Sequence, residues 1–486
     1  MAKLSRREFL KLAGTSAFFA SLNWDKLIRR AIAEVKKGSI NIIWFEAQDC
    51  AGNTTALIQA TNPDLVEILG GSSHIVGPGT VKLLFHETVM LSWGEHTPDF
   101  AKKLASMSLE EQRQFVEKLP PNDPLRKTLE TFLNLGYNIG LLLTSPIDIL
   151  KLASEGKLDP FVLVLEGSFP IDEKAGGPPN SDYFCYVGDE NGKPISCVEW
   201  MRRLLPKAAA VITVGNCASY GGLIANKVVE TGFFKSMGFD LFEKWSGKGW
   251  SPSPTGAVGF FPDPIRGTKG LVDLLPEAKP FRDFVYGRCN PEKEFPNCRP
   301  AVAVPGCPAN GNGQLRVIAH LILWALKKLG QPVPELPLPE LDKYWRPKYI
   351  FGPTVHEQCP RAATYAAGDF RKNPGDNDYR CLFMVGCKGP ISNCPWNKVG
   401  WVNGVGGPTR TGGVCIGCTM PGFTDAYEPF YKPLNAPTAP STTTMAAAAA
   451  ATAVAGGLVA YGVSKMVERG AEKAKEEMKK GSGKSS

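Results

Sequence analysis

The chain has 486 residues, 13 cysteines and a formal net charge of +8 at pH 7. This length allows two or three domains. The positive charge lies at the two ends, because residues 1–37 carry a net +6 and residues 464–486 a net +3, which leaves −1 for the body between them. A neutral body argues against nucleic-acid binding, and basic ends indicate membrane targeting.

The first 33 residues have the pattern of an export signal. Arg6 and Arg7 stand before an uncharged, mostly apolar run that extends from Leu12 to about Trp24. A twin-arginine pair in this position is typical of proteins that cross a membrane already folded. An amphipathic helix with a chance arginine pair is the alternative. We predict a twin-arginine signal peptide over residues 1–33.

Residues 38–330 alternate apolar strands with helical segments. The strands that the sequence indicates are Ile40–Phe45, Phe161–Leu165, Ala209–Val214 and Ala301–Val304. Residues 101–155 are mostly helical by pattern, and a long apolar helix extends from about Gln314 to Leu329. This alternation predicts an α/β domain with a parallel sheet.

Three of these strands end in a glycine-containing loop with one cysteine: Cys50, Cys217 and Cys307. Because ligands bind at the carboxyl ends of the strands in an open parallel sheet, the three cysteines should converge at one edge. A lone buried cysteine is usually only a small apolar residue. Three at equivalent positions favour a shared metal site.

A proline-rich linker at residues 331–345 leads to a cysteine-rich region at residues 346–430. Its candidate ligands are His356, Cys359, Cys381, Cys387, Cys394, Cys415 and Cys418. Cysteines at such spacing indicate a soft metal, because thiolates select zinc, copper(I) or iron–sulfur iron. Seven ligands divide into four and three, and three cysteines suit an iron–sulfur cluster that lacks one corner better than structural zinc, which needs four ligands. A set of disulfides is the alternative.

The remaining four cysteines are disulfide candidates. Cys185 and Cys197 flank the segment Glu190–Gly192. A three-residue hairpin loop with Gly192 in the left-handed conformation would place these two cysteines opposite each other. Cys289 and Cys298 are the second candidate pair.

The end of the chain has the pattern of a membrane anchor. After a spacer at residues 431–444, 19 residues from Met445 to Val463 carry no charge. That is long enough to span a bilayer, so we predict a transmembrane helix over residues 445–464. The basic tail at residues 465–486 would then be cytoplasmic and the body of the chain would lie on the outer face of the membrane. An alanine-rich linker to a solvated helix is the alternative.

The order of the motifs resembles the small subunit of membrane-bound, uptake-type nickel–iron hydrogenases. Besides the two terminal signals, the matching motifs are Asp49–Gly52, Gly215–Gly222, Pro305–Pro308, His356–Arg361, Cys381–Pro390, Cys394–Pro395 and Cys415–Cys418. The resemblance implies a flavodoxin-like parallel-sheet domain followed by an irregular iron–sulfur domain. It also implies that the chain relays electrons from H2 oxidation at a nickel–iron large subunit to a membrane acceptor, a cytochrome b or another quinone-reducing subunit.

By the same resemblance, three clusters divide the candidate ligands, and no catalytic residue lies in this chain. The proximal 4Fe-4S cluster takes Cys50, Cys217 and Cys307; the distal 4Fe-4S cluster takes His356, Cys359, Cys381 and Cys387; the medial 3Fe-4S cluster takes Cys394, Cys415 and Cys418.

The chain departs from the family in the turn after the first strand. Most members have a second cysteine where this chain has Asn53. Our hypothesis is that Asn53 sits at this corner of the proximal cluster, and Asp49 or one of the four spare cysteines is the alternative fourth ligand. Oxygen-tolerant members carry two further cysteines where this chain has Gly52 and Gly222. That protective cluster chemistry is therefore not expected here.

Two other classes of function are open to this sequence. An iron–sulfur electron-transfer subunit of another exported oxidoreductase would share the cysteine-rich region but not the three strand-end cysteines. A membrane-anchored, disulfide-stapled binding protein would contain no iron and an even number of cysteines, whereas this chain has 13. Glu46, Asp49 and Glu166 are candidate proton carriers or ordinary loop carboxylates.

Overall fold

The computed structural model describes residues 40–434 apart from 62–63, 66–80, 91–93, 95, 178–179, 227–252, 254, 332–335, 403 and 428–429. The expected signal peptide at residues 1–33, the anchor at 445–464 and the tail at 465–486 lie outside the described residues, as does most of the spacer. Within the described part, no helix combines the length and the apolar character that crossing a bilayer requires.

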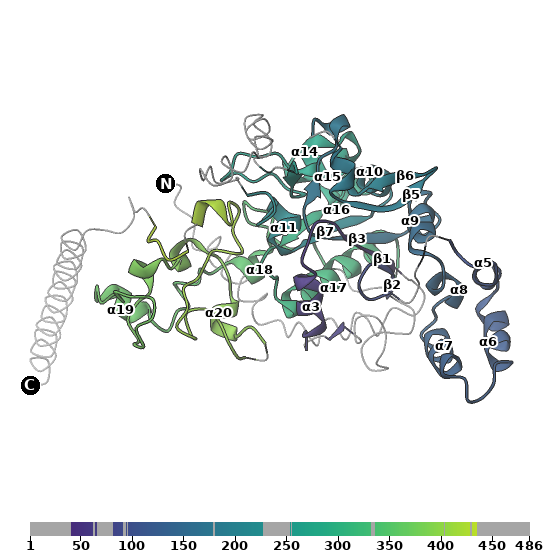
Figure 1. Ribbon diagram of the computed structural model, residues 1–486, viewed down its shortest axis with the longest axis horizontal. Helices are drawn as coiled ribbons and strands as arrows, with labels where there is room; N and C mark the ends of the chain where they lie inside the picture. The colour runs from purple at the N-terminus through teal and green to yellow at the C-terminus, as the bar shows by residue number, and fades with distance from the viewer. Residues whose placement is uncertain are drawn as a thin grey trace, which may run out of the picture.

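A five-stranded parallel sheet forms the centre of the chain (Figure 1). Its strands are β1 (Ile40–Glu46), β2 (Val81–His86), β3 (Phe161–Glu166), β7 (Ala210–Val214) and β9 (Ala301–Val304). They lie in the order β2-β1-β3-β7-β9, and every adjacent pair is parallel. Numbered within the sheet alone, this is the order 2-1-3-4-5 of flavodoxin and its relatives. The predicted α/β domain with a parallel sheet is confirmed.

Helices cover both faces of the sheet, and its central strands are apolar because both of their faces are buried. All six residues of β3 and all five of β7 are buried. One face packs against α3 (Gly52–Ile58) and α17 (Gly311–Lys328). The opposite face packs against α9 (Pro146–Ser154), α10 (Cys197–Leu204), α14 (Leu271–Leu274) and α15 (Lys279–Val285).

The long apolar helix α17 begins three residues before the predicted start at Gln314. The side chain of Asn310 accepts a hydrogen bond from the backbone N–H of Gly313 at 3.2 Å, which caps the helix. An asparagine in this position satisfies a backbone donor that the first turn leaves unpaired. The cap follows directly on the loop that carries Cys307, so α17 fixes the end of that loop.

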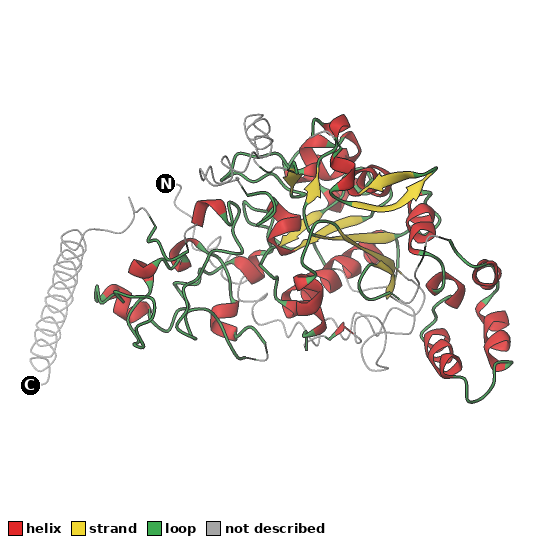
Figure 2. Ribbon diagram, in the orientation of Figure 1, coloured by secondary structure: helices red, strands yellow, loops and turns green. Residues whose placement is uncertain are grey.

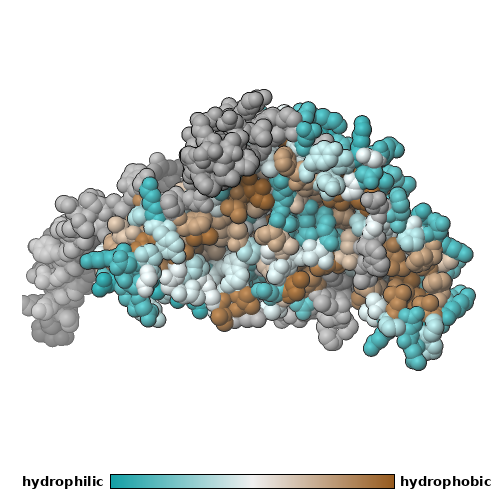
Figure 3. All heavy atoms as spheres, viewed as in Figure 1, coloured by the Kyte–Doolittle hydropathy of each residue, from teal (hydrophilic) through white to brown (hydrophobic). Residues whose placement is uncertain are grey.

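A lobe of four helices lies between β2 and β3 in the sequence and at one end of the molecule in space (Figure 1). The helices are α5 (Asp99–Ala105), α6 (Leu109–Glu117), α7 (Pro124–Asn134) and α8 (Ile139–Leu142). The lobe has a small core of its own, which includes Leu104, Val116 and Leu133. It also exposes apolar side chains such as Phe100 and Leu125, and apolar surface over the lobe is visible in Figure 3.

Residues 336–434 lie at the opposite end of the molecule and consist mainly of loops (Figure 2). Their α-helices are α18 (Lys348–Phe351), α19 (Ala362–Ala366) and α20 (Trp396–Val399). In the described part of this segment, apolar packing outside the main core consists of small groups. These are the clusters around Leu382 and Phe423 and the contacting rings of Tyr365, Phe370 and Phe383. A segment with so little core needs other constraints, and metal ligands are one such constraint.

The short elements include an antiparallel pair, β4 (Phe169–Pro170) with β8 (Ala257–Val258), and a hairpin, β5 (Tyr186–Glu190) with β6 (Lys193–Ser196). The hairpin loop has two residues, Asn191 and Gly192, with φ angles of 55° and 72°. The predicted three-residue loop is therefore wrong. Two left-handed residues suit the twist of a hairpin, and Asn-Gly is the preferred pair for such a turn.

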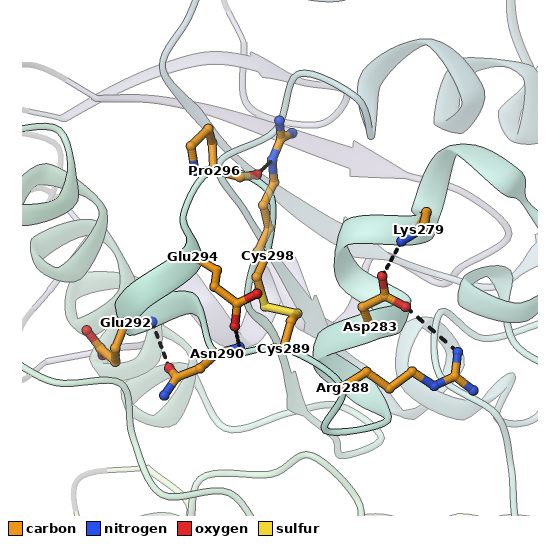
Figure 4. The surroundings of a disulfide bond; sticks show 10 residues. Lys279, Asp283, Arg288, Cys289, Asn290, Glu292, Glu294, Pro296 and Cys298 are labelled. Carbon is orange, nitrogen blue, oxygen red and sulfur yellow. Dashed lines mark hydrogen bonds and ion pairs between the residues drawn. A yellow bond between two sulfur atoms is a disulfide. The ribbon is translucent and has the colours of Figure 1, made fainter.

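The structure contains two disulfides. Cys185 and Cys197 are joined across the base of the β5–β6 hairpin, with Cα atoms 5.5 Å apart. Cys289 and Cys298 are joined with Cα atoms 5.9 Å apart and enclose α16 (Pro291–Glu294). Figure 4 shows that Asn290 and Glu294 support this second loop, because the backbone N–H of Asn290 donates to the Glu294 carboxylate at 2.8 Å.

We expect peptide mapping of the non-reduced protein by mass spectrometry to recover Cys185 linked to Cys197 and Cys289 linked to Cys298. Both Cα separations lie in the range that a disulfide spans without backbone movement. The same digest after reduction is the control. An alkylated, unlinked thiol at any of the four positions in the non-reduced digest would contradict this pairing.

Candidate metal centres

The first site lies at the carboxyl edge of the sheet, where three loops bring Cys50, Cys217 and Cys307 together. Cys50 follows β1, Cys217 lies in α11 (Gly215–Tyr220) directly after β7, and Cys307 follows β9. Burial, together with the nearby charges of Cys307 and Cys50, raises the pKa of Cys217 to about 12. The three thiols therefore act on one another, as the convergence of strand ends predicted. Cys50 and Cys307 are exposed in this chain.

The second site is a small cavity in the cysteine-rich segment. His356, Cys359, Cys381 and Cys387 all line it. Burial raises the pKa of Cys381 to about 11, and the thiolates of Cys387 and Cys359 contribute in the same direction. Burial lowers the pKa of His356, which favours the neutral imidazole that metal coordination requires. Four candidate ligands thus surround one space.

The third site contains Cys394, Cys415 and Cys418. Burial raises the pKa of each of these thiols to about 12. The charge of Cys415 also raises the pKa of Cys394, the charge of Cys418 raises that of Cys415, and the charge of Cys394 raises that of Cys418. The three thiols are therefore neighbours, although Cys394 is far from the other two in sequence.

Hydrogen bonds between ligand loops place the third site between the other two. At the sheet edge, the charge of Cys307 raises the pKa of Cys418, so these two thiols are close. On the other side, the backbone N–H of Lys388, next to Cys387 of the second site, donates to the carbonyl of Cys415 at 2.7 Å. The side chain of Asn216 also donates to the carbonyl of Cys418 at 2.9 Å. The three sites therefore form a line.

The donor set fits iron–sulfur chemistry. In the described part of the chain, nine cysteines are free, and all nine belong to these three sites. Burial makes an uncompensated thiolate unfavourable, and metal coordination reverses this because a coordinating thiol is deprotonated. The alternative of a disulfide network in this region does not apply, since the two disulfides of the structure join four other cysteines.

Asn53 is one candidate for the fourth ligand of the proximal site, but its side chain makes other hydrogen bonds. Its Oδ1 accepts a hydrogen bond from the backbone N–H of Ala309 at 2.8 Å, and its Nδ2 donates to Glu166 at 3.1 Å. Asn53 is also buried, with 6% of its surface exposed. The amide therefore joins the Cys50 turn to the loop after Cys307.

Asp49 is the other candidate that the sequence left open. Its Oδ1 accepts from the backbone N–H of Ala51 at 3.1 Å, whereas its Oδ2 is buried and has no hydrogen-bond partner among the described residues. Burial and the nearby charge of Glu166 raise the pKa of Asp49 to about 7. An oxygen atom of each of Glu46, Asp49 and Glu166 lies within 4.8 Å of the other two. Asp49 thus has a carboxylate oxygen available for a ligand.

Glu166 is a functional residue whose role sequence reasoning missed. It is fully buried at the end of β3, and its carboxylate accepts hydrogen bonds from five donor groups. The donors are the indole of Trp44, the backbone and side-chain amides of Asn53, and the backbone N–H and hydroxyl of Thr54. A carboxylate that accepts the first N–H groups of α3 caps that helix and holds the adjacent Cys50 turn. A buried carboxylate directly after an apolar strand is the only signal that the sequence offered.

The two glycines at the sheet-edge site leave little room for side chains. A Cβ at Gly52 would lie 3.0 Å from the Cys50 sulfur, and one at Gly222 would lie 2.7 Å from the Cys217 sulfur. Gly222 also has a φ of +52°, which favours glycine. Further cysteines at these positions would require the loops to move.

The chain was compared with protein families and known proteins. Residues 351–431 match the family of the C-terminal region of NiFe/NiFeSe hydrogenase small subunits, and residues 122–321 match the family "NADH ubiquinone oxidoreductase, 20 Kd subunit". The chain is 27% identical to the periplasmic NiFeSe hydrogenase small subunit of Desulfomicrobium baculatum, over 88% of this chain and 98% of that protein. It is 30% identical to the uptake hydrogenase small subunit of Azotobacter vinelandii, over 56% of this chain and 55% of that protein.

A solved structure agrees with these relatives. The actinobacterial-type NiFe-hydrogenase from Ralstonia eutropha contains a chain that is 25% identical in sequence and superposes with a TM-score of 0.53. The superposition covers 87% of this chain and 92% of that chain.

We expect Glu166→Gln to destabilise the protein. The NH2 group of the glutamine side chain replaces one carboxylate oxygen and cannot accept hydrogen bonds from the N–H groups around it. A buried donor left unpaired costs about 1–3 kcal/mol. The measurement is the thermal unfolding midpoint of the assembled protein.

Glu46→Gln is the matched control for this substitution. The described partners of the Glu46 side chain include the hydroxyls of Thr54 and Thr88, at 2.9 Å and 2.7 Å, and a hydroxyl can rotate to suit an amide. We expect a smaller change for this control. Equal midpoints for the wild type and Glu166→Gln would show that the carboxylate does not hold the turn.

Proposed function

We propose that this chain, which belongs to the small subunits of nickel–iron hydrogenases, conducts electrons along three iron–sulfur clusters that lie in a line. It is the electron-transfer subunit of a heteromeric hydrogenase. The observation that carries the proposal is that all nine free cysteines of the described chain fall into three sets, joined end to end by hydrogen bonds between their loops. Dihydrogen is oxidised at the nickel–iron centre of the large subunit.

The three sets of side chains each hold one cluster in this proposal. The proximal 4Fe-4S cluster takes Cys50, Cys217 and Cys307, the medial 3Fe-4S cluster takes Cys394, Cys415 and Cys418, and the distal 4Fe-4S cluster takes His356, Cys359, Cys381 and Cys387. Such clusters take up and release single electrons at potentials that their ligands, the hydrogen bonds to sulfur and burial determine. The protein supplies thiolates, excludes water and keeps the three sites close together.

We assign the fourth proximal position to Asp49 rather than to Asn53. The Oδ2 of Asp49 has no hydrogen-bond partner among the described residues, whereas both polar atoms of the Asn53 amide are engaged. The pKa of Asp49 is raised because its carboxylate is buried and has no positive charge beside it. A metal bound to this carboxylate would supply that charge. Glu166 has a structural role in this scheme, because five donor groups already engage its oxygens.

The partners follow from the two ends of the line. Cys50 and Cys307 are exposed at the sheet edge, and a large subunit that covers this edge would bury the proximal cluster. The distal end would pass electrons to a membrane cytochrome b or another quinone-reducing subunit. Two disulfides support a location on the outer face of the cell membrane, because disulfides persist in oxidising compartments. The N-terminal and C-terminal sequence patterns support the same location.

A second candidate function is favoured by one observation. The match of residues 122–321 to a 20 kDa subunit of NADH ubiquinone oxidoreductase indicates that this domain also occurs outside hydrogenases. An iron–sulfur subunit of another exported oxidoreductase would contain clusters but would not reduce a dye with dihydrogen. Hydrogen-dependent dye reduction by the purified complex therefore separates the two functions.

We expect the purified complex to contain about eleven cluster irons in this chain, as two four-iron clusters and one three-iron cluster require. Iron and acid-labile sulfide analysis, corrected for the iron of the large subunit, gives this number. Electron paramagnetic resonance of the oxidised complex should show a three-iron signal. An iron-free complex would rule out both candidate functions.

We expect Asp49→Ala to shift the reduction potential of the proximal cluster, because ligand identity is one determinant of that potential. Asn53→Ala is the matched comparison. It should lower the unfolding temperature while leaving the potential in place, since it removes hydrogen bonds to Ala309 and Glu166. Redox titrations of the two complexes measure the difference. A shift for Asn53→Ala and none for Asp49→Ala would reverse the assignment.

A further inference from the structure

Lys388 lies at the junction between the medial and distal sites. It follows Cys387, which lines the distal cavity, and its backbone N–H donates to the carbonyl of Cys415, a medial ligand, at 2.7 Å. Its side chain is buried, with 2% of the residue's surface exposed. One residue is thus attached to ligand loops of both sites.

The hydrogen bonds of Lys388 fit a charged side chain. Its Nζ donates to the carbonyls of Gly386 at 2.6 Å, Lys432 at 2.8 Å and Phe430 at 3.2 Å. An ammonium group has three N–H donors and a neutral amine has two. Three carbonyl acceptors around Nζ therefore match the ammonium form.

The positive charge of Lys388 has no carboxylate partner among the described residues. Three other buried cations of this chain do have one: Arg266 pairs with Asp263, Arg346 with Asp342, and Arg371 with Asp378. A buried charge is costly unless an opposite charge compensates it. The groups beside Lys388 that become negative when a metal binds them are the thiols of Cys387, its neighbour in the chain, and Cys415, whose carbonyl its backbone N–H contacts.

We propose that Lys388 is a positioning residue that holds one positive charge between the medial and distal clusters, so that it favours the reduced state of both. The proposal rests on the function proposed above. When an electron leaves the medial cluster and enters the distal one, the negative charge moves from one side of the ammonium to the other. Because the ammonium faces both sites, it stabilises the electron before and after this step.

Arg361 provides a comparison within the same chain. It is also buried, and its guanidinium donates to the carbonyls of Thr409, Asp378 and Arg380, with no carboxylate partner among the described residues. Its charge lowers the pKa of Cys381, a distal ligand. Arg361 therefore lies at the distal site, which it lines, whereas Lys388 lies between the two sites.

The test is a redox titration of the assembled complex in which electron paramagnetic resonance monitors each cluster. It compares the wild type with four variants: Lys388→Met, Lys388→Gln, Lys388→Arg and Arg361→Gln. We expect both neutral variants at position 388 to weaken reduction of the medial and distal clusters at least tenfold, which is 59 mV for a one-electron couple. Lys388→Arg keeps the charge and should stay within that tenfold range. Arg361→Gln should weaken reduction of the distal cluster only. The proximal potential should be unchanged in all four.

Iron content distinguishes the possible failures. Lys388→Gln retains two N–H donors for the carbonyls, so it is the second variant if Lys388→Met does not load its clusters. Full iron with medial and distal potentials within tenfold of the wild type would overturn the proposal, as would a shift at only one of the two clusters. Loss of medial or distal iron in both neutral variants would assign Lys388 a structural role instead. Absence of iron from the wild-type complex would overturn the proposed function itself.

Discussion

An ionised thiol in a protein interior is unfavourable unless a positive charge compensates it. Burial raises the pKa of seven free thiols in this chain, and four of them reach about 12. Bound iron would supply the compensating charge and replace the proton. The segment at residues 336–434 would depend most on this exchange, because its apolar clusters are small. A metal shared by several sulfur atoms would hold its loops in place.

The two halves of the chain place their ligands in different ways. In the α/β domain the sheet does the placing, since β1, β7 and β9 are parallel and their loops meet at one edge. Polar contacts then fix the details, with Glu166 at the start of α3 and Asn53 between two loops. In the cysteine-rich segment no sheet is present among the described residues, and buried cations hold the loops through backbone carbonyls.

The sequence predicted those features that follow from local patterns. Apolar runs located four of the five strands, and the position of Cys50, Cys217 and Cys307 after three of them predicted their convergence. It did not reveal β2, because β2 contains Lys82 and ends at His86, so its apolar run is short. The sequence predicted a three-residue hairpin loop, whereas the loop contains only Asn191 and Gly192, and both of these residues favour the left-handed conformation.

The contacts of Asn53, Glu166 and Lys388 were not predictable from the sequence for a different reason. Their partners lie far away in the chain: Ala309 is 256 residues from Asn53, and Glu166 is 113 residues from it. A pattern in the sequence identifies a buried polar residue but not the group that satisfies it. Only the tertiary structure shows whether such a residue is a ligand or a structural support.

The order of the three sites in space differs from their order in the sequence. The medial cysteines are the last ligands in the chain, yet they lie in the middle of the line. The carbonyl of Cys418 accepts from Asn216, next to Cys217, and the carbonyl of Cys415 accepts from Lys388, next to Cys387. The C-terminal loop thus returns between the α/β domain and the distal site. The spacing of the line is therefore determined by contacts between ligand loops, and a side chain such as Lys388, attached to two of these loops, is well placed to act on two sites at once.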